Sequence, residues 1–472
     1  MKSFFFYDLE TSGLNARTQR VMQFAGIRTD MDLNPIGEPL NVLVKLSDDV
    51  LPEPYAVFVT GITPQQTLMD GYTESEFCKF LYEEVFTPDT ITVGFNSIRF
   101  DDEFVRHTFW RNFYDPYEWG WSEGRSRWDL LDVIRMTRAL RPDGIKWPVD
   151  AEGKATNRLE LIAKENGLNH TKAHDALSDV EALIDVAKLV REKQPKLFNY
   201  LFDMRDKKRV AELVNLENPQ PFVYASGRYD AAYEKTTVAF PIAPGPNPGS
   251  VLVYDLRYDP TPFATATPKA LSEVMFASRE QRQDADYLKL PVKTLTYNKC
   301  PAVAPMGVLD DEAKKRLDIS IETIQANLKK LSAMTDFGAR VREAFEMREP
   351  FEPTNDVDQQ LYDGFVSDRD KGKMAAVRAA DANGLADFHP NFTDDRLNEL
   401  LVRYKARQFP SGLSEDERKT WEEYRARKLH VELPKYLETL QKLAATGSDK
   451  FILEELQLWA ESIVPETEIL GA

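Results

Sequence analysis

The hydrophobic pattern of this 472-residue chain changes twice along its length, and these changes limit the folds open to it. Up to about residue 195, short apolar or alternating segments give way to amphipathic ones, which predicts a mixed sheet flanked by helices. Short strands then dominate, and helical periodicity returns from about 311. Because the chain is too long for one ordinary core, we predict three domains: an α/β domain at 1–195, a small β domain with a helical extension at 196–350, and a helical domain at 351–472.

The expected elements follow from the same pattern. In the first segment it predicts strands at 4–9, 21–27, 40–46 and 91–95, and helices at 75–85, from about 101, and at 129–138, 158–165 and 176–190. In the second segment it predicts strands at 222–226, 236–240, 251–256 and 292–297, with a proline-rich loop at 241–249.

Composition narrows the functional classes. Only two cysteines are present, so a disulfide framework or a cysteine-based metal cluster is excluded. No apolar run approaches the roughly 20 residues that span a bilayer, and the N-terminal apolar stretch is too short for a signal peptide. We therefore expect a soluble cytoplasmic protein without a membrane partner. The net charge of −17 argues against indiscriminate nucleic-acid binding, although a local groove remains possible because salt screens the rest of the surface.

Two acids at the end of the first predicted strand carry the strongest chemical signal. Asp8 and Glu10 alternate with Leu9, which places both carboxylates on one face of the strand. Neighbouring carboxylates repel each other unless a cation lies between them, and oxygen ligands suit magnesium or manganese. The structural alternative is an exposed acidic strand end.

Further acids follow at the starts of two predicted helices. Asp101 follows a predicted strand and begins a helix, where a carboxylate also serves as an N-cap; Asp102 and Glu103 are its local rivals. Asp179 lies at the margin of the apolar stripe of the helix at 176–190, where a carboxylate is costly unless it is exposed or bound to a cation. His174 precedes that helix and is a candidate to accept a proton from a metal-activated water, or else a cap or surface histidine.

Together these residues resemble a known signature. Asp8, Glu10, Asp101, His174 and Asp179, in this order and on these elements, are typical of the DEDD exonucleases with a histidine in the last motif. The segments 99–103, 111–117, 126–132 and 138–145 are similar to those of the bacterial exodeoxyribonuclease I family, and the similarity continues at 298–301 and 358–365. It spans essentially the whole chain.

The resemblance implies a fold and an activity. The fold is a ribonuclease H-like α/β domain, followed by a small barrel-like β domain and a helical C-terminal domain. The activity is removal of nucleoside 5′-monophosphates from the 3′ end of single-stranded DNA, in DNA repair and recombination. Two Mg²⁺ ions, for which Mn²⁺ would substitute, are expected: Asp8, Glu10 and Asp179 would hold one, and Asp8 with Asp101 would position the other. The resemblance also implies a monomer associated with the bacterial nucleoid.

Other residues are weaker candidates. Thr11 and Arg158 are expected substrate contacts by resemblance, and the alternative for Arg158 is an ordinary helix-surface charge. Trp121 lies in an aromatic and basic stretch that would stack bases, and the alternative for most aromatics of this stretch is core packing. Arg141 and Tyr200 are expected to bind the acidic C-terminal tail of single-stranded DNA-binding protein. The basic and aromatic stretch at 403–409 faces either DNA or solvent.

Two alternatives to a DNA exonuclease stay open. An RNA exonuclease would use the same scaffold, because the metal site does not distinguish the sugar. A non-catalytic single-strand-binding scaffold with a decayed site is the second, and the presence of all four acids and His174 counts against it.

Overall fold

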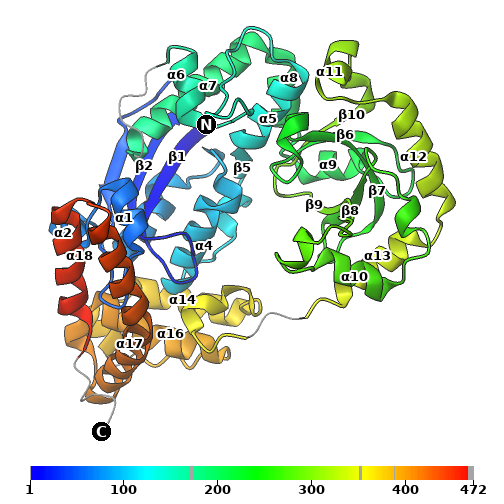
Figure 1. The fold of residues 1–472 in the computed structure, drawn as a ribbon. Helices are drawn as coiled ribbons and strands as arrows, with labels where there is room; N and C mark the ends of the chain where they lie inside the picture. Colours follow the sequence, from blue (N-terminus) through cyan, green and yellow to red (C-terminus); the bar gives the residue numbers. More distant parts are fainter. Residues whose placement is uncertain (1, 169–174, 350–352, 387, 466–472) are drawn as a thin grey trace. The chain divides into compact units, whose positions relative to one another are not determined.

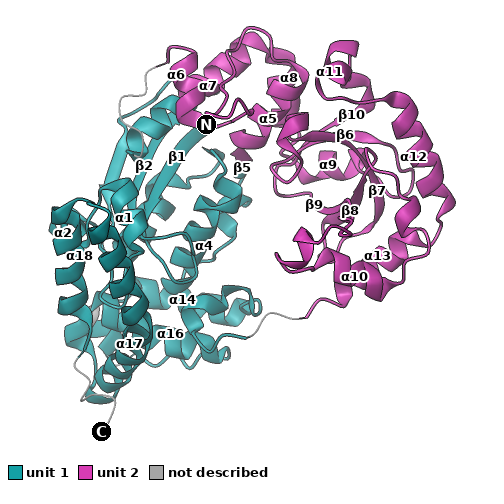
Figure 2. Ribbon diagram, viewed as in Figure 1, with its two compact units in different colours: residues 1–127, 170–183, 353–472 teal, residues 128–169, 184–352 magenta. Residues whose placement is uncertain are grey.

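The structure is a computed structural model that describes residues 2–168, 175–349, 353–386 and 388–465. The chain forms two compact units (Figure 2). Unit 1 contains residues 1–127, 170–183 and 353–472, and unit 2 contains residues 128–169 and 184–352. None of the helices within the described ranges has both the length and the apolar composition that a membrane crossing requires.

A five-stranded mixed sheet with the order β3-β2-β1-β4-β5 organises the N-terminal part of the chain (Figure 1). Its central strand β1 (Ser3–Thr11) pairs antiparallel with β2 (Val21–Thr29) and parallel with β4 (Thr90–Gly94). The edge strands are β3 (Leu40–Leu43) and β5 (Ser126–Asp129). The first half of β1 is buried on both faces, as expected for a central strand covered by helices. The predicted α/β class is confirmed.

An aromatic core joins this sheet to two helices. Phe5, Tyr7 and Leu9 of β1 share a buried cluster with Phe77 and Phe104, which lie on α3 and α4 respectively. Helices in this part of unit 1 are α1 (Pro54–Thr60), α2 (Pro64–Asp70), α3 (Glu74–Phe80), α4 (Asp101–Arg111) and the start of α7 (Ala176–Lys193). A short π-helical turn continues α3, so the single helix predicted at 75–85 has two parts.

The C-terminal helices pack directly against the N-terminal part of unit 1. Trp110 shares one buried cluster with Leu397, and Leu46 and Val57 share another with Leu429. These C-terminal helices are α14 (Asp368–Ala379), α15 (Ala382–Ala386), α16 (Asp395–Gln408), α17 (Glu415–Ala445) and α18 (Lys450–Ile463).

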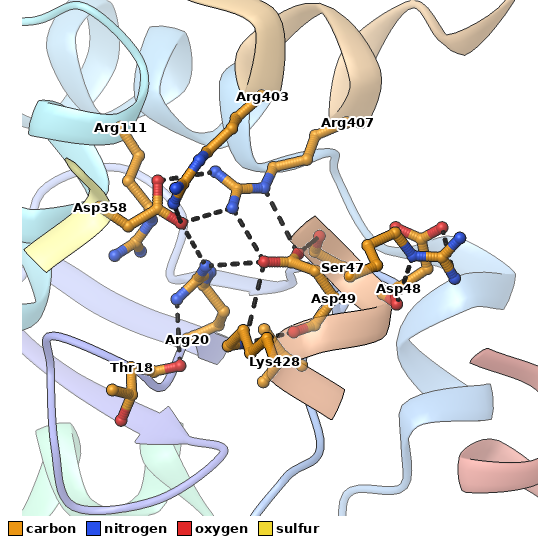
Figure 3. A network of polar contacts seen from close by, with 12 residues as sticks. Thr18, Arg20, Ser47, Asp48, Asp49, Arg111, Asp358, Arg403, Arg407 and Lys428 are labelled. Atoms are coloured by element: carbon orange, nitrogen blue, oxygen red, sulfur yellow. Dashed lines mark hydrogen bonds and ion pairs between the residues drawn. The ribbon is translucent and has the colours of Figure 1, made fainter. Parts of the chain in front are cut away.

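Buried ion pairs reinforce the same contact (Figure 3). Asp49, from the N-terminal part, and Asp358 both contact Arg407 of α16, at 2.8 Å and 2.5 Å, and both contact Arg20, at 3.4 Å and 3.3 Å. Burial alone would raise the pKa of both carboxyl groups, but Arg407 and neighbouring cations hold the pKa of each well below its usual range. The network therefore contains charged carboxylates at neutral pH.

This network corrects one sequence expectation. Neither alternative for the basic stretch at 403–409, DNA or solvent, fits its arginines and lysine: Arg403 and Lys405 are buried, and Arg407 is enclosed by Asp49 and Asp358. The partners of Arg407 are distant in sequence, so local composition did not reveal them.

Unit 2 contains a second five-stranded sheet, with the order β10-β6-β7-β8-β9 and antiparallel pairing throughout. Its strands are β6 (Phe222–Ala225), β7 (Thr236–Pro244), β8 (Ser250–Asp255), β9 (Val292–Thr296) and β10 (Ala302–Pro305). Its helices are α5 (Leu130–Leu140), α6 (Leu159–Glu165), the rest of α7, α8 (Pro195–Asp203), α9 (Lys207–Leu213), α10 (Pro268–Met275), α11 (Asp311–Arg316), α12 (Ile321–Ala333) and α13 (Phe337–Glu346).

Candidate active site

The end of β1 presents two carboxylates on one face of the sheet. Tyr7 and Leu9 point into the aromatic core, and the alternating residues Asp8 and Glu10 are partly buried on the opposite side. The pairing of β1 with β2 shifts register between Glu10 and Thr11. Such irregularities redirect side chains at a strand end, as is common next to functional sites.

Asp179 completes a group of three acids. It lies in the first turn of α7, which begins at Ala176, and the Ser178 backbone N–H donates to Asp175 Oδ1 at 3.2 Å. One carboxylate oxygen from each of Asp8, Glu10 and Asp179 lies within 4.8 Å of the other two. Segments about 170 residues apart in sequence are thus brought together at one point of unit 1.

The charges in this group oppose one another. Burial, and then the charges of Asp101, Glu10 and Asp179, raise the pKa of Asp8 well above its usual range. Burial and the charge of Asp179 raise the pKa of Glu10 to about 8. Partly buried carboxylates that repel one another are the donor set that suits a hard divalent cation, because the cation offsets the repulsion.

Asp101 is the fourth acid. It is the first residue of α4, is 4% exposed, and its charge acts on both Asp8 and Glu10. Its two sequence rivals have other partners. Asp102 accepts a hydrogen bond from Tyr7 Oη and pairs with Arg127, each at 2.5 Å. Glu103 pairs with Arg106 at 2.7 Å.

The remaining candidates are placed differently. His174 lies outside the described residues, so its role stays a prediction. Thr11 is buried, and its hydroxyl donates to the Gly13 carbonyl at 2.8 Å. Trp121 is 66% exposed, whereas its neighbour Trp119 is buried. Arg158 lies in unit 2, immediately before α6.

Arg141 and Tyr200 also belong to unit 2. The Arg141 guanidinium donates to the carbonyls of Leu140 and Val308 and pairs with Asp310 at 3.1 Å. Tyr200, on α8, is partly buried, and burial raises its pKa to about 12.

Two features of unit 1 were not predicted. Tyr7 and Arg127 bind the two oxygens of Asp102, which follows Asp101 in the chain. Phe365 is 91% exposed and lines a cavity of about 260 Å³ together with Trp121 and Tyr117. The Tyr7–Asp102 contact had one signal in the sequence, a tyrosine directly before the first acid. The cavity had none, because Phe365 is distant in sequence from the other aromatic residues that line it.

Comparison with known proteins identifies the family. Family models match the chain in three parts: an Exonuclease model at residues 5–187, an Exonuclease I SH3-like domain at 205–347 and an Exonuclease I C-terminal domain at 355–463. Exodeoxyribonuclease I of Haemophilus influenzae is 41% identical over 470 residues, which cover 99% of each chain. The chain belongs to the exodeoxyribonuclease I family.

Solved structures of this family agree with the fold. Escherichia coli exonuclease I in complex with a dA16 oligonucleotide superposes with a TM-score of 0.95 at 39% identity, covering 98% of this chain and 100% of that one. The zinc-ion-bound form of the Escherichia coli ExoI–ssDNA complex gives a TM-score of 0.94 at 39% identity, covering 98% and 99% of the two chains. The predicted architecture, with an exonuclease domain, a small barrel-like β domain and a helical C-terminal part, is confirmed, and the family model identifies the β domain as SH3-like. The exact domain boundaries stay a prediction.

Proposed function

We propose that the protein is a magnesium-dependent exonuclease that removes nucleoside 5′-monophosphates from the 3′ end of single-stranded DNA in DNA repair and recombination. The observation that carries this proposal is the group of close carboxylate oxygens from Asp8, Glu10 and Asp179, in a chain that matches the family over its whole length. Complexes of an Escherichia coli relative with single-stranded DNA support the substrate.

The acids fit two divalent cations. Asp8, Glu10 and Asp179 would hold one ion, and Asp8 with Asp101, directly or through water, would position the other. When bound, such ions activate the attacking water and neutralise charge on the leaving oxygen. The zinc-bound relative supports a divalent cation in the family, and Mg²⁺, with Mn²⁺ as a substitute, is our assignment on the chemistry of the oxygen ligands.

Residues of the protein would accept the proton of the attacking water and bind the DNA strand. His174 would accept the proton of the water as it attacks the terminal phosphodiester, and the P–O3′ bond breaks. Thr11, at the end of β1, would contact the terminal nucleotide, and Arg158 a backbone phosphate. Trp121 and Phe365 are exposed aromatic surfaces on which bases would stack, a contact that tolerates any sequence.

A protein partner is proposed on the other unit. Arg141 and Tyr200 would bind the acidic C-terminal tail of single-stranded DNA-binding protein. Because Asp310 already pairs with Arg141, a carboxylate of the tail would have to replace it, and Arg141 is 37% exposed and open to that exchange. We further propose a monomer that works in the bacterial cytoplasm at the nucleoid.

One experiment tests the substrate. An oligonucleotide labelled at its 5′ end is supplied as single-stranded DNA, duplex DNA and RNA, with Mg²⁺, to the wild-type protein and to Asp8→Ala. We expect a ladder that shortens from the 3′ end on single-stranded DNA alone. Loss of a metal ligand should slow it by at least about 100-fold, since even outer partners of metal ligands are worth 10–100-fold. A ladder mainly on RNA would overturn the substrate, and binding without any cleavage would overturn the activity.

A further inference from the structure

The acids of β1 lie beyond the point where β1 is held by its parallel neighbour. The pairing of β1 with β4 runs from Ser3 to Phe6, opposite Thr90 to Val93, and β4 ends at Gly94. Asp8 and Glu10 therefore extend past the last β1–β4 pair. The chain after β4 turns through Asn96, in the left-handed conformation with φ 67°, into the helix that begins with Asp101. On this side, the separation of Asp8 and Asp101 is not fixed by strand pairing.

A set of buried hydrogen bonds connects β1 with the start of α4. Tyr7 Oη donates to Asp102 Oδ1 at 2.5 Å, and Arg127 donates to Asp102 Oδ2 at 2.5 Å. Tyr7 and Asp102 are each 1% exposed, and the Arg127 side chain is 11% exposed. All three residues belong to unit 1.

This link, formed by Tyr7, Asp102 and Arg127, lies one residue away from both Asp8 and Asp101. Tyr7 precedes Asp8 on β1, and Asp102 follows Asp101 in the first turn of α4. Side chains alternate along a strand and rotate by about 100° per residue around a helix. Tyr7 and Asp102 thus meet on the core side of β1, while Asp8 and Asp101 interact electrostatically at the site. A change in the Tyr7–Asp102 distance would therefore shift the backbone at Asp8 and at Asp101.

The charges of the link are balanced. Asp102 would add another buried negative charge beside the cluster, and Arg127 supplies the opposite charge in direct contact. Arg127 also lies over the Trp119 ring, 5.8 Å from its centroid. A Cβ on the adjacent Gly120 would come within 2.9 Å of the Arg127 side chain, so this glycine leaves room for the guanidinium.

We propose that Tyr7, Asp102 and Arg127 are positioning residues that fix the separation of Asp8 and Asp101 and thereby set the affinity of the site for divalent cations. The inference rests on the proposed function for the identity of the metal site. It assigns no contact with metal or DNA to the three residues. Loss of the Tyr7 hydroxyl should weaken metal binding without changing DNA affinity.

The test measures Mn²⁺ binding to the full-length protein by isothermal titration calorimetry, together with the Mn²⁺ dependence of DNA cleavage. Outer partners of metal ligands are typically worth 10–100-fold in affinity, so we expect Tyr7→Phe to weaken Mn²⁺ binding about 10-fold. Cleavage should recover at saturating Mn²⁺, and the KM for DNA should be unchanged. Asp102→Asn should act in the same direction.

A matched control separates positioning from general loss of stability. Tyr436→Phe removes another buried tyrosine hydroxyl of unit 1, which donates to the Leu456 carbonyl at 3.0 Å. We expect this variant to bind Mn²⁺ like the wild type. Normal Mn²⁺ binding by Tyr7→Phe, or equal weakening in Tyr436→Phe, would overturn the positioning role alone. Wild-type protein that binds no Mn²⁺, or binds it as well after Asp8→Ala, would overturn the proposed metal site itself.

Discussion

Asp8 and Glu10 are held in a setting that is unfavourable for charged carboxylates. Both are partly buried, and both carry a raised pKa because burial and neighbouring acids disfavour ionisation. Carboxylates that repel one another are typical of a cation site, because the cation offsets their repulsion. The site therefore reduces the stability of the metal-free protein, and metal binding should restore it.

Substitution of Asp179 separates the effect of the acids on stability from their role in metal binding. Asp179→Asn removes one negative charge from the group of three acids. Without metal, we expect unfolding to become less favourable by roughly 1 kcal/mol, the equivalent of one pKa unit of relieved repulsion. Cleavage should fall sharply, because a proposed metal ligand is lost. Thermal unfolding in EDTA and a DNA cleavage assay measure the two effects, and a variant that is less stable in EDTA would contradict the account.

The pKa of Glu10 predicts a pH dependence. An acid whose folded-state pKa is raised stabilises the fold below its unfolded pKa, about 4.3, and loses this contribution as pH rises through the folded value, here about 8. Metal-free protein should therefore lose thermal stability between about pH 5 and 8. Glu10→Gln should flatten this slope, and an unchanged slope in that variant would count against the assignment.

Protonation of Glu10 opposes metal binding. Because a cation needs the ionised carboxylate, the apparent affinity for Mg²⁺ or Mn²⁺ should rise about tenfold per pH unit up to about pH 8. Calorimetric titrations at pH 6, 7 and 8 measure this, with Glu10→Gln expected to bind weakly at each pH. An affinity of the wild type that does not depend on pH would contradict the prediction.

Alternation along the first strand was enough to predict that Asp8 and Glu10 share a face. The sequence also suggested Asp101 over Asp102 and Glu103, but it gave no sign that Asp102 binds Tyr7 and Arg127. The direction of a side chain in the first turn of a helix depends on the tertiary packing around it, which no local pattern records.

At the scale of elements, most strands were predicted and two short ones were missed. Strands β1, β2, β4, β6, β8 and β9 lie close to their predicted positions, whereas β3 is shorter than predicted and β7 continues to Pro244, into the segment predicted as a proline-rich loop. The missed strands β5 and β10 are no shorter than β6, and their strand conformation depends on pairing with β4 and β6. Helix α16 lies in the segment that was predicted to be helical, but its buried Arg407 depends on Asp49 and Asp358, which lie elsewhere in the chain.

The ion network predicts an acid-sensitive contact between elements. Asp358→Asn would remove a buried counter-charge that Arg407 and Arg403 share, although Arg407 would keep Asp49 as a buried partner. Breaking a buried pair in this way costs about 3–5 kcal/mol of unfolding free energy. Denaturant unfolding at pH 7 measures the loss. Glu438→Gln, which breaks an exposed pair with Lys442, is the control and should leave stability unchanged.

The pH dependence of this contact has the opposite sign to that of Glu10 in the proposed metal site. The pKa of Asp358 is lowered, so its contribution is present above the unfolded value of about 3.9 and is lost as pH falls below it. Wild-type stability should therefore decline on acidification from about pH 5. Asp358→Asn should show a shallower decline, and an equally steep one would mean that this carboxylate does not carry the contact.

At the scale of the whole molecule, sequence patterns predicted the order of the α/β, β and helical parts but not their grouping in space. Residues 353–472 join residues 1–127 in one compact unit, although more than 200 residues separate them. The physical reason lies in shared buried clusters, such as that of Leu46 with Leu429, and in the ion network around Asp49. Contacts of this kind depend on both partners and cannot be predicted from either segment alone.

The proposed reaction is tested most directly by the identity of the first product and by its dependence on metal. Single-stranded DNA carrying a labelled 3′-terminal nucleotide is mixed with the protein in a quenched-flow experiment, with Mg²⁺ or with EDTA, and Asp8→Ala is run in parallel. We expect release of that nucleotide as a 5′-monophosphate, only with Mg²⁺ and at least about 100-fold more slowly in the variant. Release as a 3′-monophosphate, release in EDTA, or undiminished release by Asp8→Ala would contradict it.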